Sequence, residues 1–275
     1  MSESCTHDCK TCSKNCGDRT APQSMLAEPN KFSKIGKVIG IVSGKGGVGK
    51  SLVTSLLAST MQKRGKNAAI LDADITGPSI PKVFGVRGPL TGDERGLIPA
   101  KSADGVQIVS VNLMLENDTD PVIWRGPVIA TAVKQFWTDP VWEDVDFMFV
   151  DMPPGTGDVP LTVFQSLPVD GIVVVTSPQE LVTMIVDKAV KMADMMKVPV
   201  LGIVENMAYF ECNSCGERHY IYGESHIDSH AEALGIDTVC QIPITPALAA
   251  LCDGGRIEAF PCTWLDTLLN KIENL

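Results

Sequence analysis

The segment Gly44–Ser51, GKGGVGKS, constrains this chain more than any other part of the sequence. It follows the apolar run Val38–Ser43 and precedes the helix-like stretch Leu52–Arg64. A strand that enters a glycine-rich turn and then a helix directs several backbone N–H groups, and the positive end of the helix dipole, to one point. The glycines let the backbone approach phosphate oxygens, because no Cβ stands in the way. The segment therefore predicts a phosphate-binding loop.

The loop also fits the pattern GxxxxGK[ST]. In that pattern Lys50 reaches the β and γ phosphates of a nucleotide, and the Ser51 hydroxyl helps to hold Mg²⁺. A glycine-rich connection that binds nothing does not explain a Lys-Ser pair at the required offset. The residues that we predict to contact the nucleotide in this loop are Gly44, Lys45, Gly46, Gly47, Val48, Gly49, Lys50, Ser51 and Leu52.

Length and charge narrow the possible functions. The chain has 275 residues, enough for one large α/β domain or two small ones. Its net charge of -10 disfavours nonspecific binding to nucleic acid or to anionic membranes, so we expect neither as a partner. No apolar run approaches the roughly 18 residues of a membrane span. We therefore expect a cytoplasmic protein, in which the nine cysteines serve metal binding rather than disulfides.

Four of these cysteines lie in a polar N-terminal segment. Cys5, Cys9, Cys12 and Cys16 follow the spacing C-x3-C-x2-C-x3-C, which matches the ligand count of an iron–sulfur cluster or of an all-cysteine zinc site. The surrounding residues offer little to a hydrophobic core. We therefore predict that residues 1–35 form a Cys-rich tail that is disordered or organised only by its metal.

From residue 36 onward, apolar strands alternate with helical stretches. This alternation predicts an α/β fold of the P-loop NTPase type, with a mostly parallel sheet and helices on both faces. Because no linker interrupts it, we expect one domain over residues 36–275. Arg87–Ala103 is rich in glycine, proline and charge, which predicts a surface loop or hairpin. The strands expected after Val38–Ser43 are Asn67–Asp72, Val106–Val111, Phe147–Asp151, Gly171–Thr176 and Val198–Glu205.

Two aspartates follow predicted strands, at the sheet edge where ligands of such folds bind. Asp151 comes directly after Phe147–Val150, and Asp74 lies two residues beyond the second strand. With Ser51, they form a predicted magnesium site. Asp74 also suits a catalytic role in positioning the attacking water. The loop PPGTGD, Pro153–Asp158, is typical of a segment that senses the γ-phosphate.

The combined motifs resemble a known family. They are GKGGVGKS, DADITGPS, WRGP at Trp124–Pro127, DMPPGTGD, TSPQ at Thr176–Gln179 and ENMAYFECNSCGE at Glu205–Glu217. Together they resemble the Mrp/ApbC-type iron–sulfur cluster carriers, a branch of the MinD/ParA-like ATPases with a deviant phosphate loop. The resemblance covers nearly everything after Gly36.

The resemblance implies a slow ATPase that transfers clusters to apoproteins. It implies that Lys45 reaches across a homodimer to the partner's nucleotide and acts in catalysis with Lys50 and Asp74. It also implies that Asn206 contacts the adenine, and that Asp74 and Asp151 serve the two nucleotide switches. The tail is similar to the N-terminal cluster motif of the cytosolic scaffold members, although its spacing departs from theirs.

Cys212 and Cys215 form a second cysteine site, whose two thiolates are an incomplete ligand set. One hypothesis, favoured by the resemblance, is a four-iron four-sulfur cluster that bridges two copies. The other is a zinc site completed by His226 and His230, with the spacing C-x2-C-x10-H-x3-H. His219 is a further local donor. Two alternative functions stay open: a MinD/ParA-like spatial switch, and a zinc-stabilised regulatory ATPase.

Three further predictions concern the core. We expect Cys240, Cys252 and Cys262 to be small core residues rather than ligands. We expect the methionine-rich stretch Met184–Met196 to fill a core helix. The amphipathic C-terminal stretch Thr263–Leu275 lacks a basic face, so we expect it to pack on the domain rather than on a membrane.

Overall fold

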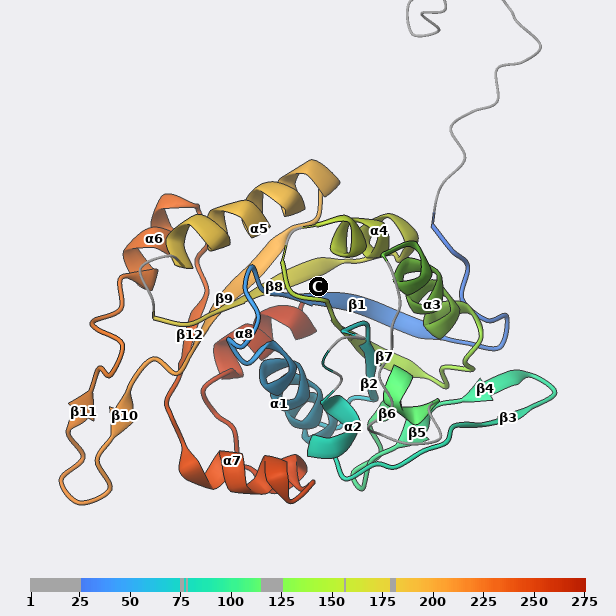
Figure 1. The fold of residues 1–275 in the computed structure, drawn as a ribbon, viewed down its shortest axis with the longest axis horizontal. Helices are drawn as coiled ribbons and strands as arrows, with labels where there is room; N and C mark the ends of the chain where they lie inside the picture. Colours follow the sequence, from blue (N-terminus) through green and yellow to red (C-terminus); the bar gives the residue numbers. More distant parts are fainter. Residues whose placement is uncertain (1–25, 75–76, 78, 115–125, 156, 179–181) are drawn as a thin grey trace, which may run out of the picture.

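A computed structural model describes the chain except residues 1–25, 75–76, 78, 115–125, 156 and 179–181. Its centre is an eight-stranded sheet of order β12-β9-β8-β1-β7-β2-β6-β5 (Figure 1). All neighbouring strands are parallel except β5 and β6, which are antiparallel. The strands are β1 Ile35–Val42, β2 Ala68–Asp72, β5 Ala100–Lys101, β6 Gln107–Val109, β7 Val145–Asp151, β8 Gly171–Thr176, β9 Val200–Asn206 and β12 Val239–Ile242.

Continuous burial explains why these strands form a parallel sheet. Every residue of β2 and of β8 is buried, as expected for strands covered on both faces. In the register, Asp151 at the end of β7 lies opposite Asp72 of β2 on one side and Ile41 of β1 on the other. The sheet therefore brings the carboxylates of two neighbouring strands to the edge where the phosphate loop begins.

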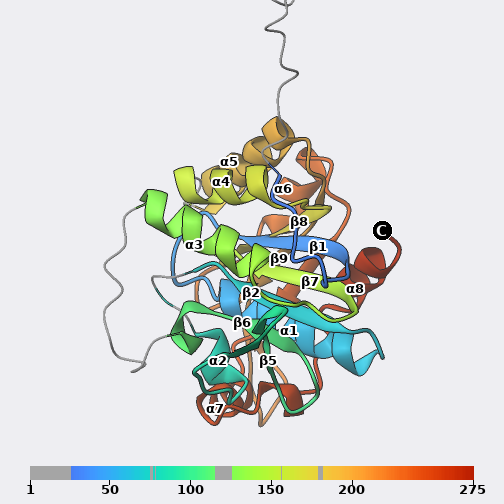
Figure 2. The same ribbon diagram turned by 90° about the vertical axis from the view of Figure 1, so that its right-hand side faces the viewer.

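Helices cover both faces of the sheet, which confirms the predicted layers (Figures 1 and 2). One core lies between the sheet and α3, α4, α5 and α6, and includes Phe136, Phe164 and Val186. The other lies between the sheet and α1, α2, α7 and α8, and includes Leu56 and Leu268. The helices are α1 Lys50–Lys63, α2 Ile80–Val83, α3 Gly126–Thr138, α4 Asp158–Ser166, α5 Val182–Met196, α6 Ile227–Ala233, α7 Pro246–Asp253 and α8 Asp266–Glu273, with short 3₁₀ turns at Val111–Leu113 and Ile257–Ala259.

Two hairpins project from this body (Figure 1). The first, β3 Thr91–Asp93 with β4 Gly96–Ile98, lies within the predicted loop or hairpin Arg87–Ala103. The second pairs β10 Phe210–Glu211 with β11 Arg218–His219 and carries the second cysteine motif. The two hairpins lie at opposite ends of the molecule.

The predictions for the core are partly confirmed. Helix α8 buries Leu268, Leu269 and Ile272 against the domain, and no helix in the described part of the chain is long and apolar enough to span a membrane. Helix α5 bears out the prediction in part, because Met192 is buried and Met196 packs against the core, whereas Met184 and Met195 are 53% and 79% exposed. Its apolar stripe is narrower than the methionine content suggested, and the flexible methionines outside it point to solvent.

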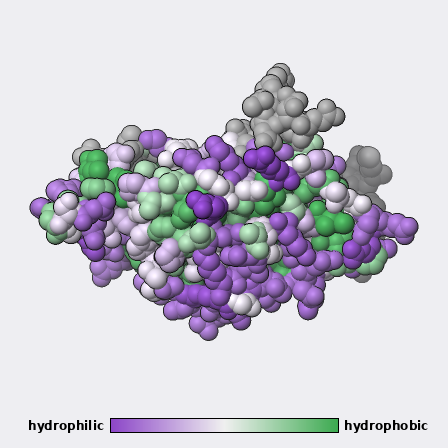
Figure 3. Space-filling model, turned by 90° about the horizontal axis from the view of Figure 1, so that it is seen from below, coloured by the Kyte–Doolittle hydropathy of each residue, from purple (hydrophilic) through white to green (hydrophobic). Residues whose placement is uncertain are grey.

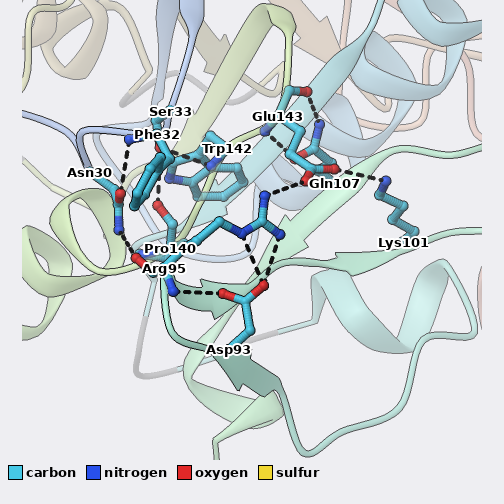
Figure 4. Close-up of polar contacts among 10 residues, drawn as sticks. All are labelled: Asn30, Phe32, Ser33, Asp93, Arg95, Lys101, Gln107, Pro140, Trp142 and Glu143. Carbon is cyan, nitrogen blue, oxygen red and sulfur yellow. Dashed lines mark hydrogen bonds and ion pairs between the residues drawn. The ribbon is translucent and has the colours of Figure 1, made fainter.

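The N-terminal boundary also differs from the prediction at residue 35. Ala27 is buried in the core between the sheet and α3, its N–H donates to the Ser166 carbonyl at 2.7 Å, and its carbonyl accepts from Trp137 Nε1 at 2.9 Å. The Ser33 hydroxyl donates to the Pro140 carbonyl and accepts from the Trp142 N–H (Figure 4). Residues 27–34 therefore pack on the domain, and the part of the predicted tail before residue 26, including Cys5, Cys9, Cys12 and Cys16, lies outside the described residues.

A polar network joins this segment to the first hairpin (Figure 4). Asn30 Nδ2 donates to the Arg95 carbonyl at 2.9 Å, and the Arg95 guanidinium pairs with Asp93 at 2.8 Å and with Glu143 at 3.4 Å. Gln107 Nε2 in turn donates to the Glu143 carbonyl at 2.7 Å. Because the ion pairs are largely exposed, they stabilise the fold little, and the backbone and amide contacts fix the hairpin in place.

Two truncations test this boundary. Removing residues 1–25 should leave the free energy of unfolding nearly unchanged. Removing residues 1–34 should lower it by about 2–5 kcal/mol, because Trp137 Nε1 and the Trp142 N–H lose partners and each unsatisfied buried donor costs about 1–3 kcal/mol. Urea unfolding of both proteins under reducing conditions measures the difference. Equal stability of the two truncated proteins would contradict the packing role of residues 27–34.

Candidate functional site

The predicted phosphate loop lies at the carboxyl edge of the sheet and ends where α1 begins. Gly47 and Gly49 have φ angles of 82° and 85°, a backbone region that favours glycine. A Cβ added at Gly46 or Gly47 would meet no atom within 4 Å, so the loop backbone faces open space. Helix α1 has 14 residues, and its N-terminus opens toward this space. The geometry is that of an anion cradle.

Lys50, the first residue of α1, is the buried cation of this cradle. Its Nζ lies 2.9 Å from Asp151 Oδ1 and 3.3 Å from Asp74 Oδ2. Burial by itself lowers the pKa of Lys50, but the two carboxylates outweigh it, so the net pKa lies above the ordinary value. Neither contact has hydrogen-bond geometry within the described residues. The ammonium therefore stays charged and retains donors for an incoming phosphate.

Asp151 connects Lys50 to two hydroxyl groups of α1. Its Oδ2 accepts from the Ser51 hydroxyl at 2.6 Å, and its Oδ1 accepts from the Thr54 hydroxyl at 2.7 Å. Side-chain and carboxylate oxygens of this kind are the ligands that Mg²⁺ prefers. The structure thus brings together Ser51, Asp151 and Asp74, the three predicted magnesium residues, around Lys50.

Asp72 is a third carboxylate in this cluster and is not among the site residues predicted from the sequence. It accepts from the Ser110 hydroxyl at 2.8 Å and from the Asp74 N–H at 3.2 Å. Complete burial, together with the nearby charge of Asp151, holds the pKa of Asp72 well above its usual range. Its position as the last residue of β2, next to Asp74, was the available signal in the sequence.

A cleft of about 700 Å³ extends from the phosphate loop toward α7. Asn206, at the end of β9, lies at this cleft and donates from Nδ2 to the Val48 carbonyl at 2.9 Å. Gly49 permits this approach, because a Cβ there would collide with the Asn206 amide. The wall beyond Asn206 was not predicted from sequence and consists of Met207, Pro243, Ile244, Thr245, Pro246, Leu248, Ala249, Cys252 and Asp253.

The three single cysteines fall into two classes. Cys240 and Cys262 are buried core residues, as predicted. Cys252 is half-buried and lines the cleft, so its position differs from the prediction. The reason is that α7 presents one side to the core and the other to the cleft.

The loop after Asp151 approaches the phosphate loop. The Gly155 N–H donates to the Ser43 carbonyl at 2.8 Å, and Pro154 lines the cleft. Gly155 has a φ of 95°, which explains the glycine at this turn. Thr156 lies outside the described residues, as do Trp124 and Arg125 of the WRGP motif and Gln179 of the TSPQ motif.

Cys212 and Cys215 lie in the turn of the second hairpin. The turn is closed by hydrogen bonds from the Cys212 N–H to the Glu217 carbonyl at 2.9 Å and from the Gly216 N–H to the Cys212 carbonyl at 2.8 Å. Backbone N–H groups of Ser214 and Cys215 point to the Cys212 sulfur and hold the pKa of its thiol below the usual value. Cys215 is exposed. The turn thus favours a metal-binding thiolate at the surface.

The structure does not assemble the alternative zinc site with His226 and His230. Within the described residues, no three His, Cys, Asp or Glu side chains gather around a possible metal position. His230 lies on α6, with Nε2 3.0 Å from Asp187 Oδ1 of α5. Helical packing of α6 on α5 therefore directs this histidine away from the cysteine turn.

Strand β9 links the cleft to the cysteine turn. The Ala208 N–H donates to the Ile242 carbonyl, and the Ile244 N–H donates to the Tyr209 carbonyl, so the first limb of the hairpin is bonded to the wall of the cleft. Glu205, buried at the end of β9, accepts from Ser225 and Gln241 at 2.8 Å each. Burial raises the pKa of Glu205. The return limb of the hairpin is thereby fixed to the same strand.

Comparison with known proteins decides the family. The model of the ParA family described as NUBPL iron-transfer P-loop NTPase matches residues 34–272. The chain belongs to this family. The finding confirms the family and the fold predicted from the motifs.

The chain is similar to several known proteins. The chain is 41% identical to the iron–sulfur cluster carrier protein of Clostridium perfringens over 260 residues, which cover 92% of this chain and 90% of the relative. It is 43% identical to the protein of the same name from Saccharolobus solfataricus, with 82% and 77% covered. A nucleotide-binding protein from Archaeoglobus fulgidus in complex with ADP has a TM-score of 0.78 and 43% identity, with 85% of this chain and 92% of that chain covered. The MinD cell division protein of Aquifex aeolicus, at 19% identity and a TM-score of 0.57, shares the fold.

Replacing Lys50 tests the phosphate loop. Lys50→Ala should weaken ATP binding by about tenfold or more, because a hydrogen bond to a charged group typically contributes about 1.5–3 kcal/mol. Lys66→Ala removes an exposed lysine just beyond the same helix and should leave the affinity unchanged. Calorimetric titration of both variants with ATP measures the difference. Unchanged ATP affinity in Lys50→Ala would remove the phosphate-loop assignment.

Proposed function

We propose that this chain is an ATP-hydrolysing iron–sulfur cluster carrier that works as a homodimer. Two copies hold one four-iron four-sulfur cluster between their Cys212 and Cys215 pairs and transfer it to apoproteins. One observation supports this most: β9 ends at Asn206, whose amide contacts the phosphate loop, and the cysteine turn begins six residues later. The nucleotide cleft and the cargo site are thus parts of one continuous structure.

The chemistry of the cysteine turn supports an iron–sulfur cargo. A four-iron cluster takes four thiolates, and each copy supplies two from this turn. The lowered pKa of Cys212 increases its thiolate fraction at neutral pH, and soft thiolates suit iron–sulfur clusters. The exposure of Cys215 leaves room for the partner's ligands. We propose a second, separate cluster or metal at Cys5, Cys9, Cys12 and Cys16.

The cleft supports ATP as the nucleotide. The loop backbone and Lys50 would bind the β and γ phosphates, and Asn206 would exchange its bond to the Val48 carbonyl for one to the adenine. Ser51, Asp74 and Asp151 would hold Mg²⁺, which supplies charge neutralisation at the phosphates. Asp74 lies beside Lys50 at the open side of the cluster, where it can orient the attacking water.

We propose that Lys45 of each copy contacts the nucleotide bound by the partner copy and so completes the partner's ATPase site. Lys45 is exposed on the phosphate loop, whereas Lys50 is buried. Lys45→Ala should therefore leave ATP affinity within about twofold of the unsubstituted chain, yet lower the hydrolysis rate by at least about tenfold, a typical loss for a group that stabilises transition-state charge. Binding and steady-state phosphate release, measured on the same preparation, separate the two effects. A loss of binding equal to that in Lys50→Ala would exclude the proposed role across the dimer.

The cysteine turn is tested by counting iron. The full chain with serine at positions 5, 9, 12 and 16 should bind, after anaerobic reconstitution, close to four irons per dimer at the remaining turn. Cys212→Ala or Cys215→Ala in that background should abolish this iron, while ATP binding and thermal stability stay the same because the turn lies at the surface. Iron and acid-labile sulfide analysis provides the measurement. One zinc per monomer in place of the cluster would refute the bridge.

The location of the protein in the cytoplasm stays a prediction from the sequence.

A further inference from the structure

A run of three exposed side chains follows the cysteine turn. Tyr220, Ile221 and Tyr222 are 43%, 60% and 46% exposed. They lie directly after β11, on the limb of the hairpin that returns to the domain. Most other exposed large apolar residues of the described chain stand apart in the sequence, such as Ile98 on β4 and Met195 on α5. Scattered apolar residues are ordinary on a protein surface, whereas three consecutive ones beside an incomplete metal site require a reason.

The run is supported by ordered aromatic contacts. The Tyr220 ring packs edge-on against Tyr209 with centroids 6.4 Å apart, and the Arg218 guanidinium lies 4.4 Å above the Tyr209 ring. These contacts fix the hairpin base, so Ile221 and Tyr222 are presented from an ordered platform. Tyrosine and arginine are enriched at the centres of protein interfaces. Figure 3, which keeps the left-to-right direction of Figure 1, shows hydrophobic surface among hydrophilic residues at the end where this hairpin lies.

We propose that Tyr220–Tyr222 is the surface through which a second copy of this chain packs beside the shared cluster. This inference rests on the proposed function. If two Cys212 and Cys215 pairs meet at one cluster, a twofold axis passes close to both turns. Tyr220 and Tyr222 follow Cys215 by five and seven residue steps, and an extended chain spans at most about 3.5 Å per step, so the whole run lies within roughly 25 Å of Cys215. Each copy's run therefore lies near the same axis, and its exposed side chains are available for contact with the partner.

The net charge of each copy and the interface area that a stable dimer needs both favour an apolar contact surface beside the cluster. Each copy carries a net charge of -10, so two copies repel one another at long range. Four cysteine ligands cover little area, and stable interfaces bury more than about 1,000 Å². Apolar side chains around the cluster supply short-range attraction and exclude water from it. They would also keep the copies together while a cluster enters or leaves.

The test places one charge in the run. In the full chain with serine at positions 5, 9, 12 and 16, Ile221→Asp should raise the dimer dissociation constant by at least about tenfold, because an unpaired charge would be buried at the contact. The cluster bound at the turn should fall in parallel. Ile98→Asp makes the same change at the opposite hairpin and should alter neither quantity. Analytical ultracentrifugation of reconstituted protein, with iron analysis and ADP binding on the same samples, provides the measurements.

The outcomes are distinguishable. Loss of dimer and cluster in Ile221→Asp, with ADP binding and thermal stability retained, supports the proposal, and Tyr222→Asp should behave alike. Normal dimerisation and iron content in both variants would overturn it and leave the proposed function intact. If the variants dimerise and bind the cluster normally but no longer transfer it to an apo-ferredoxin, the proposal is also overturned. Tyr220–Tyr222 would then be a contact surface for recipient proteins. The control is the chain with serine at positions 5, 9, 12 and 16 and the native Ile221 and Tyr222. If this control stays monomeric and binds no cluster at the turn, the proposed function itself is refuted.

Discussion

The site depends on the pairing of the buried Lys50 ammonium with the carboxylates of Asp74 and Asp151. Removing a charge from water is costly, and the cost is offset only when opposite charges lie close. The sheet supplies them, because the parallel register of β2 and β7 places Asp72 and Asp151 side by side and directs Asp74 to the same edge. Lys50 faces three carboxylates, and burial together with the nearby charge of Asp151 raises the pKa of Asp72.

This arrangement gives the site a definite structure. Lys50 and Ser51 contact the carboxylates, and Asn206 contacts the loop carbonyl of Val48. Each of these contacts uses a group that the proposed function assigns to ATP or magnesium. Nucleotide binding would therefore exchange existing partners rather than order a free loop. For binding to be favourable, the contacts with the ligand must be lower in free energy than the internal contacts that they replace.

Hydrogen bonds connect the cleft to the cysteine turn, so an exchange of partners at the cleft could change the position of the turn. The hairpin is bonded at its first limb to the wall of the cleft through Ile242 and Ile244, and at its return limb to Glu205 through Ser225. A shift of Asn206 or of the cleft wall would be transmitted to the first limb by backbone hydrogen bonds and to the return limb by the side-chain bond between Ser225 and Glu205. The proposed cargo site thus lies close in the chain to the proposed nucleotide site and at the surface of the domain.

The sequence by itself determined the elements and the loop. Glycine spacing and continuous apolar runs specify a phosphate loop between a buried strand and a helix, and β8 begins and ends as predicted, because these patterns are local. Tertiary structure decided which residues meet. Asp72 joined the cluster through strand register, His230 paired with α5 instead of a metal, Cys252 lined the cleft, and residues 27–34 packed on Trp137 and Trp142. Each of these depends on contacts between segments far apart in the chain, and no local pattern encodes the burial or the pairing that such contacts create.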